Sequence, residues 1–166
     1  MNFFALITAL LTLFPHMSGN NRQCIIHTQA RIVQVLQMSQ QQYPNVQPEV
    51  LFVVGFIETH LGCDANEGGG WGVPISRNRR HTAGPPVYAA MILNRGLEVC
   101  GNIHGAVHRF RTGLCRHRRN WGSLEYRRMA EIGNRYERLV FRRVRDLQNR
   151  ILVIPTRELT EMVTVQ

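Results

Sequence analysis

The last third of the chain carries the longest helical pattern of apolar residues in the sequence. Between residues 129 and 151, apolar residues recur every three or four positions, which is the spacing of one face of an α-helix. Arginine fills many of the other positions. A helix of this length needs other helices to cover its apolar face, and this requirement favours a helical bundle. The face consists of Met129, Ile132, Tyr136, Leu139, Val140, Val144, Leu147 and Ile151.

Glycine and proline divide the preceding residues into shorter segments of the same period. We predict helices over residues 22–42, 48–61, 85–100 and 103–112, and we expect Ile26, Ala30 and Val33 on the inner face of the first. No strand pattern is evident. The prediction is an all-α single domain of about five to seven helices. Residues 63–84 form a long Gly-rich loop, and loops of that length are usually functional.

The N-terminal segment is apolar from Phe3 to Phe14 and ends at Pro15. About 12 residues is the size of a signal-peptide core and is too short to span a bilayer. We therefore expect residues 1–19 to be a signal peptide, with a short buried helix of the mature protein as the alternative. Residues 20–155 would then be the folded domain and 156–166 a tail. Export would place the protein in the periplasm or outside the cell, with no stable membrane span.

Four cysteines stand at positions 24, 63, 100 and 115, and they allow three pairings. In an exported protein one or two disulfides are expected. Cys100 and Cys115 flank one short helix, so we predict that pair, with Cys63 bonded to either of them as the alternative. The resulting loop of about 16 residues would contribute ~3 kcal/mol on the chain-entropy model.

The charge is strongly basic and unevenly distributed. All 20 basic residues are arginine, against 11 acidic residues. Residues 1–76 hold two Arg and four acids, whereas residues 77–166 hold eighteen Arg and seven acids, which makes their net charges −2 and +11. Such a surface favours a polyanionic partner: a nucleic acid, an anionic membrane or an anionic cell-wall polymer. The expected export and the lack of a nucleic-acid-binding signature favour the wall polymer, so we expect no nucleic acid.

Glu58 is the residue that does not fit its helix. It lies seven residues after Leu51 and four after Val54, so its side chain joins the apolar stripe. Apolar surroundings and the negative end of the helix dipole both disfavour a carboxylate there. A carboxyl group that keeps its proton can act as a general acid. The alternative is that Glu58 reaches water or pairs with an arginine.

The segment Phe56-Ile57-Glu58-Thr59 resembles the catalytic-glutamate motif of the lysozyme-like superfamily, most closely that of soluble lytic transglycosylases. Three further segments resemble motifs of that family in the same order, over about residues 45–145. They are Gly70-Trp71-Gly72-Val73-Pro74-Ile75, Phe110-Arg111-Thr112-Gly113 and Arg135-Tyr136-Glu137-Arg138-Leu139-Val140. The chain departs from the family at Pro74, where the family has Gln, and at Phe110, where it has Tyr.

The resemblance implies a lysozyme-like fold and a peptidoglycan-cleaving enzyme, a lytic transglycosylase or muramidase. Its substrate would be the β-1,4 bond between N-acetylmuramic acid and N-acetylglucosamine in peptidoglycan strands. Glu58 would be the catalytic acid and base, and Asp64 and Glu67 are the candidates for a second acid, as lysozymes use. The expected substrate-binding residues are Thr59, Trp71, Gly72, Phe110 and Tyr136. The alternative function is an Arg-rich nucleic-acid-binding or non-catalytic wall-binding protein.

Two candidate metal ligands are His104 and His108, which lie four residues apart on one helical face near Cys115 and His117. No acid lies within that pair, and the spacing otherwise matches no zinc motif. We therefore expect neither a metal nor a cofactor.

Overall fold

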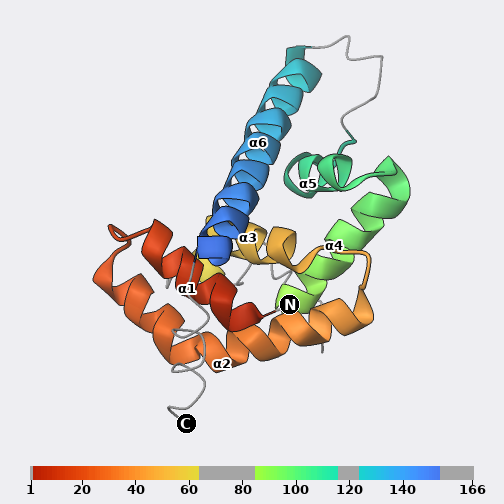
Figure 1. Cartoon of the computed structure of the whole chain (residues 1–166). Coiled ribbons are helices and arrows are strands. Elements are labelled where there is room, and N and C mark those ends of the chain that lie inside the picture. Colours follow the sequence, from red (N-terminus) through yellow and green to blue (C-terminus); the bar gives the residue numbers. More distant parts are fainter. Residues whose placement is uncertain (1, 64–84, 116–123, 154–166) are drawn as a thin grey trace.

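A computed structural model of the chain describes residues 2–63, 85–115 and 124–153 (Figure 1). These residues contain six α-helices and one 3₁₀ turn but no strand, so the all-α prediction is confirmed. None of these helices has the length and apolarity needed to cross a membrane. The elements are α1 (Phe3–Leu13), α2 (Gly19–Gln42), α3 (Pro48–Thr59), the 3₁₀ turn η1 (His60–Gly62), α4 (Pro85–Cys100), α5 (Ile103–Thr112) and α6 (Leu124–Val153).

Helix α3 lies in the middle of the molecule and contacts α2, α4 and α6. Its sequence is apolar on every face, and Val50 to Val54 are all at most 2% exposed, as expected of a helix enclosed by others. Pro48 occupies its first turn, where the missing N–H costs nothing. The helix ends where His60 and Leu61 adopt left-handed backbone angles, φ 46° and 61°, followed by Gly62 at φ 88°.

Helix α1 belongs to the hydrophobic core. Leu6, Ile7 and Leu10 are at most 1% exposed, and α1 packs against α2 and α6. Asn2 caps the helix by accepting hydrogen bonds from the backbone N–H groups of Phe4 and Ala5. Residues 3–13 therefore form a helix whose inner face is part of the core.

Helix α2 buries a different face from the predicted one. Ile26 is 42% exposed and Ala30 is also exposed, whereas Ile25, Ile32 and Leu36 are buried with Val33. The two faces differ by about one residue of helical rotation, because the segment offers isoleucines at both 25 and 26 and only packing chooses between them.

Helix α6 runs from α5 at one end of the molecule to α1 at the other (Figure 1). Tyr136, Val140, Val144 and Leu147 form its buried stripe, but the predicted Ile132 is 46% exposed. Gly133 takes the inner position instead. A Cβ atom on Gly133 would lie 2.3 Å from Nε2 of His108, whose fully buried ring occupies this space.

Two disulfides link the helices. Cys100 bonds to Cys115 across α5, as predicted, and Cys24 of α2 bonds to Cys63 after the 3₁₀ turn. The second pair closes the longer loop, with a sequence separation of 39 residues. Because loop-closure entropy grows with length, it should contribute slightly more to stability than the first, about 4 against about 3 kcal/mol.

We predict that Gly133→Ala destabilises the protein although alanine is the better helix former by about 1 kcal/mol. The added methyl group must displace the His108 ring, and overpacking of this kind costs about 1–3 kcal/mol or more. The net loss of about 1–2 kcal/mol should lower the midpoint of thermal unfolding by about 2–8 °C in a chain of this size. Gly19→Ala is the control, because no atom lies within 4 Å of its added Cβ. Equal midpoints for the two variants would contradict the close approach of α5 and α6.

Candidate functional site

Glu58 lies near the end of α3, and its side chain is 11% exposed. The enclosure of α3 leaves only its last turn near the surface, and this brings the carboxyl group to the edge of the core. The burial predicted from its place in the apolar stripe is therefore present. Thr59, which follows it, is fully buried.

Arg111 reaches Glu58 from α5. Its Nη1 atom donates a hydrogen bond to Glu58 Oε2 at 3.4 Å, and the arginine side chain is itself 50% exposed. The guanidinium supplies an opposite charge to a carboxyl group that is largely removed from water. This pairing is the alternative that the sequence left open. The sequence could not name Arg111 as the partner, because 53 residues separate the two and the chain holds 20 arginines.

Tyr136 brings the third helix, α6, to the same place. Its side chain is buried, and its ring centroid lies 5.8 Å from the Arg111 guanidinium carbon. Burial raises the pKa of the Tyr136 hydroxyl well above its usual range, and the negative charge of the nearby Glu58 raises it further, while Arg111 lowers it. In this conformation the hydroxyl oxygen is within electrostatic reach of Glu58 but has no partner within hydrogen-bond limits. The phenol therefore stays protonated and is a donor that a small side-chain shift would bring onto the carboxylate.

The fold thus joins Glu58, Arg111 and Tyr136 from α3, α5 and α6. Two of these, Glu58 and Tyr136, are predicted site residues. Together they place a carboxyl group in a partly dry site, with a cation that can balance its charge after it gives up a proton and a neutral phenol close to it.

The other predicted substrate-binding residues occupy different surroundings. Thr59 Oγ1 donates to the carbonyl of Gly55 at 3.3 Å and accepts from the N–H of Gly62 at 3.0 Å, so it shapes the turn after α3. Phe110 is half-buried and packs against the core. Trp71, Gly72, Asp64, Glu67 and Pro74 lie outside the described residues.

The two candidate metal ligands, His104 and His108, have separate structural surroundings. His108 is fully buried with Nδ1 2.8 Å from the carbonyl oxygen of Leu114. His104 is paired through Nδ1 with Glu137 at 2.9 Å, and Cys115 is oxidised in a disulfide. Within the described ranges, no cluster of three or more His, Cys, Asp or Glu side chains is arranged to hold a metal ion.

No family model, curated protein or solved structure matches this chain.

The raised pKa of Tyr136 predicts a loss of stability at high pH. Above about pH 10 the unfolded chain releases the phenol proton, while the folded protein keeps it. The unfolded state then binds fewer protons, so the free energy of unfolding falls by up to ~1.4 kcal/mol per pH unit from this group. Urea unfolding of wild type and Tyr136→Phe between about pH 9 and 11.5 measures the slope, which should be shallower in the variant.

Tyr126→Phe serves as the control for this measurement, because Tyr126 is on the same helix and is 50% exposed. If Tyr136→Phe and Tyr126→Phe show the same slope, the buried phenol is not the group that makes the fold sensitive to alkali.

Proposed function

We propose that this chain cleaves peptidoglycan glycan strands with Glu58 as general acid and base. The observation that carries the proposal is a nearly buried carboxyl group at the end of an enclosed helix, with Arg111 and Tyr136 reaching it from two other helices. It is supported by four segments that resemble lytic transglycosylase motifs in the family's order, and by the all-α architecture. The target is the β-1,4 bond between N-acetylmuramic acid and N-acetylglucosamine.

The chemistry needs two proton transfers, one from Glu58 and one back to it. Glu58 gives its proton to the glycosidic oxygen, and the bond from that oxygen to the muramic acid carbon breaks. The resulting carboxylate then takes a proton from a hydroxyl of the same sugar, whose oxygen closes a 1,6-anhydro ring. Glu58 is thereby returned to its acid form, and no water is consumed. A hydrolase would use a second acid to hold water or to stabilise the transition state. The lyase reaction needs only Glu58, so we favour it.

Arg111 and Tyr136 have distinct parts in this proposal. Arg111 holds the ionised carboxylate in the free protein, and because it is half exposed, a bound glycan can displace it. Its displacement would free the Glu58 carboxyl group to reach the glycosidic oxygen. Tyr136 remains neutral, and a small shift of its side chain would let its hydroxyl donate a hydrogen bond to Glu58 and orient the carboxyl group toward the substrate.

Glu58→Gln should abolish the release of anhydro-muropeptides from purified peptidoglycan, measured by mass spectrometry. Glutamine keeps the shape of the side chain but cannot transfer the proton, a step that contributes about 10²–10⁴-fold to the rate. Thermal unfolding should change little, because the arginine left without its partner is half exposed and can be hydrated. Pelleting with insoluble wall should also persist, since the arginine-rich surface is unchanged.

Glu49→Gln is the matched control, because Glu49 lies in the first turn of the same helix, at the end opposite Glu58. It should retain wild-type release. Equal release by wild type and Glu58→Gln would remove Glu58 as the catalyst. If the wild-type protein pellets with several wall types but releases nothing, the chain is instead the non-catalytic wall-binding protein of the alternative.

A further inference from the structure

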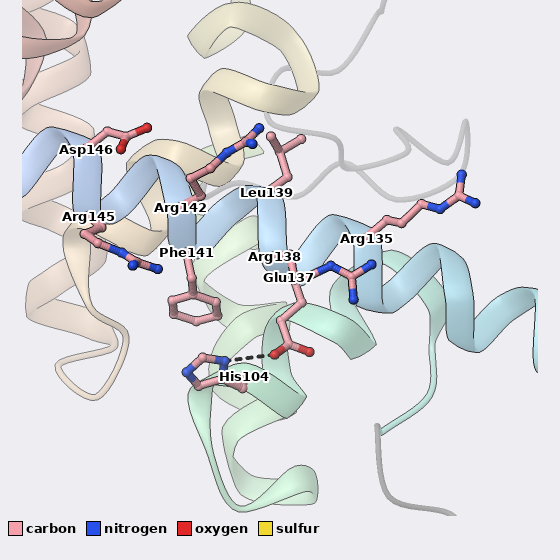
Figure 2. A pocket seen from close by; sticks show the side chains of 9 residues that line it. All are labelled: His104, Arg135, Glu137, Arg138, Leu139, Phe141, Arg142, Arg145 and Asp146. Carbon is pink, nitrogen blue, oxygen red and sulfur yellow. Dashed lines mark hydrogen bonds and ion pairs between the residues drawn. The ribbon is translucent and has the colours of Figure 1, made fainter.

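A second feature lies on another part of α6, at its junction with α5. A cavity of about 640 Å³ opens there, lined by side chains of α6 and by His104 of α5 (Figure 2). His104 is stacked on Phe141 with ring centroids 3.9 Å apart, and its Nδ1 atom is hydrogen-bonded to the buried Glu137. The imidazole therefore has a fixed position in the wall of the cavity.

Four arginines of α6 line the same cavity: Arg135, Arg138, Arg142 and Arg145. Their spacing of three, four and three residues places them along one side of the helix, over about 15 Å. By the same periodicity they lie nearly opposite the buried stripe that contains Tyr136. We call these four residues the arginine stripe.

The arginine stripe has no acidic partner among the described residues. Each of its four side chains is exposed, and within the described part of the chain none makes an ion pair. The two acids in the cavity wall are already engaged, Glu137 with His104 and Asp146 with Arg143 at 3.8 Å. The cavity thus keeps a positive field.

The chemistry of the stripe suits a phosphate-bearing chain. A guanidinium presents a planar fork of N–H groups that binds phosphate oxygens in pairs. A row of four guanidinium groups matches a polymer with repeated phosphates better than it matches a single anion. The two disulfides indicate an oxidising compartment, where the phosphodiester polymers of the cell wall are found rather than nucleic acids.

We propose that the arginine stripe and its cavity bind a phosphodiester wall polymer of the poly(glycerol phosphate) type. This site is distinct from Glu58, and binding there needs no glycan cleavage. It would hold the protein on the wall.

The test uses fluorescein-labelled poly(glycerol phosphate), which contains no bond that Glu58 would cleave, and measures anisotropy with the full chain between about 50 and 200 mM salt. Arg138→Gln/Arg142→Gln/Arg145→Gln should bind at least tenfold more weakly than wild type, because three charge-assisted contacts are lost.

The control Arg31→Gln/Arg95→Gln/Arg109→Gln removes the same charge from α2, α4 and α5, and its affinity should stay within about threefold of the wild-type value. Circular dichroism confirms that both variants fold.

Three outcomes would overturn the proposal. Equal weakening of the two triple variants would mean that net charge alone attracts the polymer. No binding of poly(glycerol phosphate) by wild type would exclude this ligand. Tighter binding of single-stranded RNA, lost in the stripe variant alone, would assign the same residues to a nucleic acid instead.

Discussion

Helix α3 has no face that is open to water along most of its length, and the need to cover it places the helices around it. Covering a helix on all sides requires neighbours on each, and α2, α4 and α6 supply them. The enclosure also decides where a polar side chain can stand. Glu58, in the last turn, is placed where two other helices can bring polar groups to it.

Two polar side chains from other helices lie close to Glu58. Arg111 pairs with its nearly buried carboxyl group, and Tyr136 is held neutral by burial and by the nearby carboxylate. A charge in a partly dry place is tolerable only when it is paired or hydrogen-bonded. Arg111 is the charged partner of Glu58. Because the arginine side chain is half exposed, a ligand can displace it from Glu58.

Helix α6 carries two different surfaces on one segment. Its inner side holds Tyr136 against the core and close to α5, where Gly133 leaves room for the His108 ring. Its outer side carries the arginine stripe beside the His104–Glu137 pair. Both disulfides lie outside this helix. Its position therefore depends on packing against α1, α3 and α5.

Local sequence patterns predict the helices and one of the two disulfides. The breaks at Pro48, Pro85, Gly101 and Gly113 place helix ends within a few residues, because proline and glycine act through local backbone geometry. Glu58 was also found from the sequence, since a carboxyl group in an apolar stripe is a local contradiction.

The tertiary structure alone decided which contacts form across the chain. Whether Ile25 or Ile26 faces inward in α2 depends on neighbouring helices, and so does the exposure of Ile132 beside Gly133. The choice of Arg111 among 20 arginines and the pairing of Cys24 with Cys63 likewise have no local signal. Local sequence sets backbone conformation over a few residues, but contacts between distant residues depend on the shape of the space that the packed helices leave between them.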